Sequence, residues 1–185
     1  MNSLIRPVLF LLLLPLQALA AEEGAPATSL FDRPVTPIRL SLPVSGVVQE
    51  VLVKVGDRVK KGATLLRLDP RRFQYQLAAA EAALRVAEAD FEEAERDLNF
   101  QKELLERMVT TENEMRTARL NGVRAEAAVA ALIAARDEAR LNLELSELKA
   151  PKDGVVLERH YHPGEVINSE QQQPPLLIRF GVERE

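Results

Sequence analysis

One short motif occurs twice in this chain, once on each side of a long stretch without turn residues. Each copy has a glycine before Val-Val and a second glycine ten positions later that an acidic residue follows, at Gly46 and Gly56 and again at Gly154 and Gly164. We expect these four glycines to be structural turns, because glycine tolerates the positive φ that tight turns require. Residues 71–150 contain no proline and a single glycine. The pattern therefore predicts a β module that is split by a helical insertion.

The first half of the insertion carries apolar residues at alternating steps of four and three, with charged residues between them. This heptad pattern predicts a coiled-coil helix over about residues 70–108, with Pro70 at its first position and Asp69 as the N-cap. The predicted seam is Phe73, Leu77, Ala80, Leu84, Ala87, Phe91, Ala94, Leu98, Gln101, Leu105 and Met108.

The second half opens with Thr111-Glu112-Asn113-Glu114, which has the form of a capping box. Its helix is expected to end at about Lys149, before Pro151. Two long helices joined by a short turn are antiparallel neighbours, so residues 70–149 form a hairpin with its tip at about 108–114. The second helix offers two registers for its seam, and the pattern does not decide between them. One is Leu120, Ala127, Ala134, Leu141 and Leu148, and the other is Met115, Val129 and Leu143.

Short β-branched and aliphatic runs bounded by turn residues flank the insertion on both sides. We expect strands from Val35 onward, a first half of the β domain over 35–69, a second half over 150–181 and a tail over 182–185. The expected strand segments are 38–42, 46–53, 64–68, 154–159, 166–167 and 176–180. The fold class is α+β: a β-sandwich split by a long antiparallel coiled-coil hairpin.

The N-terminal segment reads as a secretory signal. Arg6 precedes an apolar run, and Ala18-Leu19-Ala20 forms a small-x-small cleavage site, so we expect a signal peptide over 1–21 and a flexible leader over 22–34. The chain has no cysteine, which excludes disulfides and a lipobox anchor. A net charge of −4 disfavours binding to nucleic acid.

Four stretches carry a resemblance to a known family: residues 43–48, 55–62, 66–70 and 148–156, in this order around the heptads. The chain resembles the HlyD-type membrane fusion proteins, which are periplasmic adaptor subunits of tripartite efflux pumps and secretion systems. The resemblance implies a lipoyl-like (biotinyl/lipoyl) sandwich whose hairpin points toward an outer-membrane channel. It also implies a periplasmic location after signal-peptide cleavage, with membrane association through partners.

The implied partners are an inner-membrane transporter of RND or ABC type, a TolC-type channel and further copies of the chain. The sequence departs from the family in two ways. In the tip signature R-x(3)-L-x(6)-S, Leu104 can take the leucine place, but Phe100 then stands at the arginine place and Thr110 reaches the serine place only after one deletion. The family usually continues into a β-barrel and a membrane-proximal domain, whereas this sequence ends soon after Phe180, so we expect a short form.

We expect function to reside at the hairpin tip, where apolar side chains cannot be covered by two helices alone. The predicted docking residues are Leu104, Leu105, Arg107, Met108, Val109 and Thr110. Two alternatives remain: a coiled-coil scaffold of the envelope outside any pump, and, remotely, a biotinyl or lipoyl carrier. The carrier needs a lysine at an exposed hairpin, but the matching place after Leu68 has none, and Lys149 is expected to cap a helix C-terminus.

His160 and His162 are the weak candidates for a metal site. On a strand the two rings would share one face, but only two firm ligands are present where structural zinc sites use four. No nucleophile motif or phosphate-binding loop occurs, so we expect neither an enzyme nor a cofactor.

Overall fold

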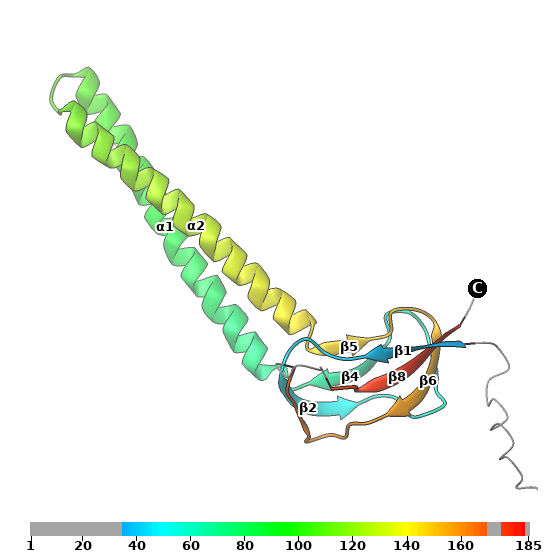
Figure 1. Cartoon of the computed structure of the whole chain (residues 1–185). Helices are drawn as coiled ribbons and strands as arrows, with labels where there is room; N and C mark the ends of the chain where they lie inside the picture. The colour runs from blue at the N-terminus through cyan, green and yellow to red at the C-terminus, as the bar shows by residue number, and fades with distance from the viewer. Residues whose placement is uncertain (1–34, 170–174, 184–185) are drawn as a thin grey trace, which may run out of the picture. The chain divides into compact units, whose positions relative to one another are not determined.

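The computed structural model describes residues 35–169 and 175–183. The predicted signal peptide, the leader and the end of the tail lie outside these residues. Two four-stranded antiparallel sheets and a helical hairpin make up the described part (Figure 1). Neither helix of this part has an apolar run long enough to cross a membrane.

Each sheet combines strands from before and after the hairpin. The first has the order β1 (Val35–Leu40), β8 (Ile178–Glu183), β6 (Gly154–Arg159) and β3 (Arg58–Val59). The second has the order β5 (Glu147–Lys149), β4 (Thr64–Leu68), β2 (Gly46–Val51) and β7 (Val166–Ile167). The pairings β3 with β6, β2 with β7 and β4 with β5 join the two halves, which confirms the prediction of a split β module.

The hydrophobic core lies between the two sheets and also draws on both halves. Leu65, Leu66 and Leu68 from β4 are fully buried, as are Ile178 and Phe180 from β8. The first helix adds Phe73 and the second adds Leu143 at the edge of this core. The hairpin is therefore anchored at its root by side chains that share the core of the sandwich.

The four repeated glycines serve two different purposes. Gly56 and Gly164 have φ of 94° and 91°, so the second glycine of each repeat is a turn residue as predicted. The prediction is wrong for Gly46 and Gly154, which begin strands β2 and β6. Glycine fits these positions because a side chain has little room there. A Cβ on Gly154, for example, would lie 2.8 Å from the Phe180 ring.

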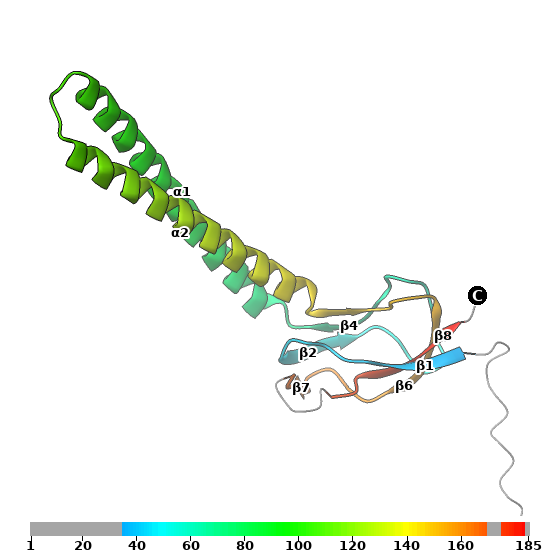
Figure 2. The same cartoon turned by 45° about the horizontal axis from the view of Figure 1, so that its top comes forward.

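The hairpin consists of α1 (Arg71–Glu106) and α2 (Glu112–Glu144), which lie side by side in both views (Figures 1 and 2). With 36 residues, α1 is about 54 Å long.

The predicted seam of α1 is confirmed from Phe73 to Leu105, because each of its residues is buried or half-buried. Leu84 and Ala87 are buried, while Leu98 is only half-buried because a single helix covers it. Met108 lies beyond α1 and is exposed, so the prediction that it belongs to the seam is wrong.

The seam of α2 follows the register of Met115, Val129 and Leu143, which are all half-buried. Ala118 and Gly122 are its buried members. The other register leaves Leu120, Ala127, Ala134 and Leu141 exposed on the outer face of α2. The structure thus decides between the two registers, but it leaves a second apolar stripe on α2 without cover from this hairpin.

The start of α1 differs by one residue from the prediction. Pro70 is the N-cap and α1 begins at Arg71, although the Asp69 carboxylate still accepts a hydrogen bond from the Arg71 backbone N–H at 3.0 Å. Asp69 also accepts hydrogen bonds from the Arg71 guanidinium. The side-chain and then the backbone hydrogen bonds from Arg71 lower the pKa of Asp69 to about 2.

The end of α2 was predicted too late. The helix ends at Glu144, and residues 147–149 form β5 instead, with Leu148 buried opposite Leu66. Ser146 makes the change of direction, because its backbone carbonyl accepts a hydrogen bond from the Leu68 N–H at 2.9 Å. Pairing with β4 satisfies the backbone here, so Lys149 is a strand residue that pairs with Glu147 and does not cap a helix.

Candidate functional site

The tip of the hairpin is an ordered turn with a defined hydrogen-bond pattern. Met108 N–H donates to the Leu105 carbonyl and Val109 N–H donates to the Leu104 carbonyl, both at 2.9 Å. These two bonds form a Schellman motif, which satisfies the last carbonyl groups of α1. Leu104 and Leu105 thus contribute backbone acceptors at the tip, and their side chains are half-buried.

Met108 occupies the position of this motif where glycine is most common. Its φ of 58° is the single positive value among the described residues other than glycine. A side chain in this left-handed conformation costs roughly 1 kcal/mol or more. Met108 is also 93% exposed and the adjacent Val109 is 70% exposed. The turn therefore holds two apolar side chains outward, one of them in a backbone conformation that glycine would adopt at lower cost.

The other side of the tip is fixed by the predicted capping box, which is confirmed. Thr111 Oγ1 accepts a hydrogen bond from the Glu114 N–H, and the Glu114 carboxylate accepts one from the Thr111 N–H at 3.0 Å. Because both helix ends are closed by their own hydrogen bonds, the tip presents side chains and few free backbone groups.

Thr110 has an internal role that the sequence did not indicate. Its hydroxyl donates to Glu114 Oε2 at 2.6 Å and lies 3.0 Å from Gln101 Oε1. The hydrogen bond from Thr110, followed by those from Thr111, lowers the pKa of Glu114 below its ordinary value. Thr110 thus ties the turn to both helices, whereas the predicted docking residue Arg107 is exposed and forms no ion pair within 35–169 and 175–183.

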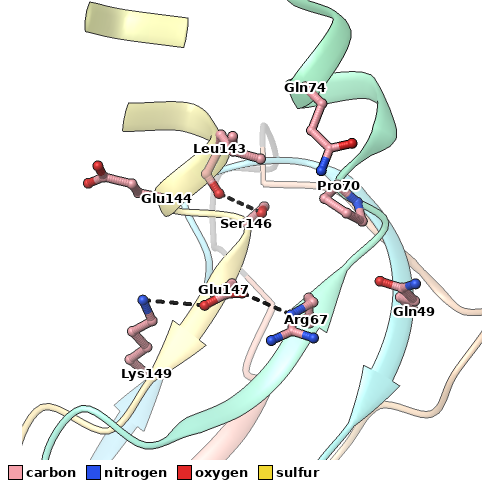
Figure 3. Close-up of a pocket in the computed structure, with 9 residues that line it drawn as sticks. All are labelled: Gln49, Arg67, Pro70, Gln74, Leu143, Glu144, Ser146, Glu147 and Lys149. Carbon is pink, nitrogen blue, oxygen red and sulfur yellow. Dashed lines mark hydrogen bonds and ion pairs between the residues drawn. The ribbon is translucent and has the colours of Figure 1, made fainter. Parts of the chain in front are cut away.

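A pocket of about 520 Å³ lies at the other end of the hairpin, where both helices meet the second sheet (Figure 3). Arg67 is one of the lining residues and donates to Glu50 at 2.7 Å and to Glu147 at 2.9 Å. Partial burial acts to raise the pKa of Glu147, but hydrogen bonds from Arg67 and Lys149 outweigh it and lower that pKa. Three charged residues of the lining, Arg67, Glu147 and Lys149, are thus paired across β4 and β5, and Arg67 also reaches Glu50 on β2.

The one hydroxyl in the pocket lining belongs to Ser146, which is buried and donates to the Leu143 carbonyl at 2.6 Å (Figure 3). Its hydroxyl is thus bonded to a backbone carbonyl, and within 35–169 and 175–183 no hydrogen bond joins it to a side-chain base that could activate it as a nucleophile. The arrangement joins the hairpin root to the sandwich, and the sequence did not predict it because its members are about 80 residues apart, as Arg67 and Glu147 are.

The two histidines do not converge. His160 and His162 follow β6, which ends at Arg159, so they do not share a strand face as expected. His160 lies 3.2 Å from Glu158, which also accepts a hydrogen bond from Arg179, and His162 lies 3.4 Å from Glu165. The hydrogen bond from Arg179, more than that from His160, lowers the pKa of Glu158. No cluster of three or more metal-binding side chains occurs in the described segments.

Comparison with known proteins places these features in a family. Residues 38–173 match the family model described as the CzcB-like, barrel-sandwich hybrid domain. The chain is 31% identical over 168 residues to the multidrug resistance protein MdtA of Photorhabdus laumondii, covering 89% of this chain but 42% of that protein. The chain therefore spans less than half the length of this relative.

Two solved structures resemble the described fold. One is a MacA–MexA chimera with the α-hairpin domain of Pseudomonas aeruginosa MexA, at 25% identity and a TM-score of 0.55, covering 81% of this chain and 47% of the other. The other is the membrane fusion protein Spr0693 of Streptococcus pneumoniae R6, at 18% identity and a TM-score of 0.61, covering 81% and 60%. The second likeness concerns the fold alone. With its split sandwich, its helical hairpin and a family match over most of its length, the chain belongs to the membrane fusion proteins with a CzcB-like barrel-sandwich hybrid domain.

Proposed function

We propose that this chain is a periplasmic adaptor that links an inner-membrane transporter to an outer-membrane channel, with the hairpin tip as its docking element. The tip carries the proposal: Met108 and Val109 are held outward at the end of a helical hairpin by a turn closed on both sides. Exposed apolar groups at a rigid, ordered position suit contact with another protein's surface. Family membership, and the description of the relative MdtA as a multidrug resistance protein, support efflux.

The docking residues divide by role in this proposal. Met108 and Val109 make apolar contacts, and Arg107 offers a guanidinium at the rim that no carboxylate of the described residues occupies. Leu104, Leu105 and Thr110 support the turn through their backbone and hydroxyl hydrogen bonds. A TolC-type channel is the partner implied by the family, and the transporter is of RND or ABC type.

The test is an efflux assay combined with crosslinking to the channel in cells. Met108→Glu and Val109→Asp are expected to abolish efflux and crosslinking while the melting temperature stays close to wild type, because both side chains are exposed in the free protein. Asn121→Glu adds the same charge to the exposed surface of α2 and is the matched control, which should leave efflux unchanged.

The double variant His160→Ala with His162→Ala tests the competing site. We expect it to keep wild-type efflux. Loss of efflux in this variant, together with full efflux in the tip variants, would favour a metal-dependent function. Wild-type efflux in every variant and in a deletion strain would favour the envelope scaffold.

The proposed location requires removal of the predicted signal peptide. Mass spectrometry of a periplasmic extract is expected to give a mature N-terminus at Ala21 or Glu22. Recovery of the protein with Met1 intact from the membrane fraction alone would contradict this.

A further inference from the structure

The sulfur atoms of this chain lie close to the hairpin tip. The sequence has three methionines and no cysteine, and Met1 belongs to the predicted signal peptide. The expected mature chain therefore carries two sulfur atoms, in Met108 of the turn and in Met115 of the first turn of α2. Met108 is 93% exposed, whereas Met115 is half-buried in the seam between the helices. Solvent thus reaches one thioether freely and the other only in part.

The backbone of the turn restricts which apolar side chain fits at Met108. Its φ of 58° lies in the left-handed region, where β-branched residues such as valine and isoleucine are outliers. Methionine is apolar, unbranched at Cβ and flexible in its other torsions, so it meets this requirement. Leucine is also unbranched at Cβ and carries no sulfur. Met108→Leu is therefore a matched variant that keeps the apolar surface and removes the thioether.

A thioether at such an exposed position reacts with oxidants that transfer an oxygen atom, such as hypochlorous acid and hydrogen peroxide. A lone pair of the Met108 sulfur attacks the oxygen of hypochlorous acid, so an S–O bond forms and the O–Cl bond breaks with its electron pair going to chloride. Loss of the hydroxyl proton to water leaves the sulfoxide. Sulfur is oxidised by two electrons, and the chlorine is reduced to chloride. Because the oxidant must reach the sulfur, Met108 should react before Met115.

The fold of the tip does not depend on the Met108 side chain. The backbone N–H groups of Met108 and Val109 make the hydrogen bonds that close α1, to the carbonyls of Leu105 and Leu104. The capping box at Thr111 closes α2. A sulfoxide oxygen on an almost fully exposed side chain is hydrated and displaces no packed neighbour. Oxidation should therefore change the surface of the tip and leave the hairpin folded.

We propose that Met108 is an oxidation site that switches docking at the tip off and on. The sulfoxide is polar, and burying its oxygen against an apolar partner surface without a donor costs free energy. A methionine sulfoxide reductase reverses the change, because a dithiol is oxidised to a disulfide while the sulfoxide oxygen leaves as water. This inference rests on the proposed function, in which Met108 and Val109 make the apolar contacts. It adds regulation of that same site by oxidants.

The first experiment locates the oxidation in the purified mature chain under limiting hypochlorous acid. Trypsin cleaves after Arg107 and Arg116, so one peptide holds both Met108 and Met115. Tandem mass spectrometry of this peptide compares the two positions directly. We expect Met108 to gain oxygen about fivefold faster than Met115 or more, with an unchanged melting temperature. Methionine sulfoxide reductases for both sulfoxide epimers, with dithiothreitol, should remove the oxygen again.

The second experiment measures crosslinking to the channel in cells before and after a short pulse of hypochlorous acid. Wild-type crosslinking should fall by about tenfold after the pulse. Met108→Leu should crosslink equally before and after it, which also controls for oxidation of the channel. Met115→Leu should lose crosslinking as wild type does. Met108→Gln, whose amide imitates the polarity of the sulfoxide, should lose it without any oxidant.

Three results would overturn the inference. One is oxidation of Met115 as fast as that of Met108, and another is a lower melting temperature once Met108 alone is oxidised. The third is a loss of crosslinking after the pulse in Met108→Leu as large as in wild type, because another group would then be responsible.

These failures are distinguishable from failure of the proposed function. If untreated Met108→Glu crosslinks to the channel as wild type does, the tip is not the docking element, and the proposed function and the switch fail together. If untreated Met108→Glu loses crosslinking but oxidised wild type retains it, docking at the tip stands and the switch alone fails.

Discussion

The sandwich and the hairpin differ in how completely they bury their apolar side chains. The sandwich encloses residues such as Leu65, Ile178 and Phe180 completely, using strands that are far apart in the sequence. Of the 36 residues of α1, only Phe73, Leu84 and Ala87 are buried, and Phe73 belongs to the sandwich core. The sandwich thus supplies stability that needs no partner, whereas the hairpin supplies surface that two helices cannot cover.

This difference assigns separate tasks to the two regions. Surface that is left uncovered costs free energy in water, about 25 cal/mol per Å² of apolar area, unless another molecule covers it. In the hairpin the uncovered groups are ordered: Met108 and Val109 at the tip, and the second apolar stripe on the outer face of α2. Mutations in the sandwich should therefore act on folding, and mutations on the outside of the hairpin should act on association.

The largest expected effect is in the core of the sandwich. Phe180→Ala removes a fully buried ring from the middle of β8 and should lower the free energy of unfolding by about 3 to 5 kcal/mol. Urea titration followed by circular dichroism measures this loss. A change below about 1 kcal/mol would show that the sandwich is not the stable region of the molecule.

A smaller loss is expected in the hairpin seam. Leu84→Ala deletes a buried side chain between two helices, where solvent can enter the space, so the loss should be near the low end of the range, about 2 kcal/mol. Glu92→Ala changes an exposed residue of the same helix and should alter stability by about 0.5 kcal/mol or less. A greater loss from Glu92→Ala would contradict the register of α1.

The same contrast explains what the sequence could predict. The seam of α1 is a local pattern, and each residue from Phe73 to Leu105 lies where the heptads put it. The end of α2 is set by a distant partner, β4, which takes residues 147–149 into a sheet. Pro151 restricts only the residue before it, so no local signal marked Glu144 as the last helical residue.

In the hairpin and its tip, too, local sequence patterns predict some features and leave others open. The two registers of α2 are both apolar, and only the position of α1 decides which one faces inward. The capping box at Thr111 is a motif of adjacent residues and was predictable, whereas the left-handed Met108 was not, since such positions usually hold glycine. The Arg67 pairs depend on strand pairing, which local patterns do not reveal.

A substitution at Met108 separates stability from docking at the tip. Met108→Gly places glycine at a φ of 58° and should stabilise the hairpin by up to about 1 kcal/mol, because the left-handed conformation no longer opposes a side chain. Under the proposed function it should also lose channel crosslinking. Arg107→Gly, at a φ of −87°, is the control and should not stabilise. A destabilised Met108→Gly would mean that the methionine side chain contributes to the fold of the free protein.

The smallest effect is expected at the junction between the two regions, where Asp69 connects β4 to α1. Its pKa of about 2 in the folded protein lies below the ordinary value near 4, so the charged carboxylate stabilises the fold above pH 4. This contribution should shrink as the pH falls from about 4 through the folded pKa of about 2, where half of the carboxylates are protonated, and it is lost below that pH. Asp69→Asn keeps an oxygen that can accept from the Arg71 N–H but removes the charge. Its melting temperature should therefore be slightly below wild type at pH 7, and the difference should be much smaller at pH 2. Salt at about 1 M should shrink the difference at pH 7, since the pair with Arg71 is exposed. A difference as large at pH 2 as at pH 7 would assign the effect to the hydrogen bond at the helix start, and the junction would then depend on backbone geometry more than on charge.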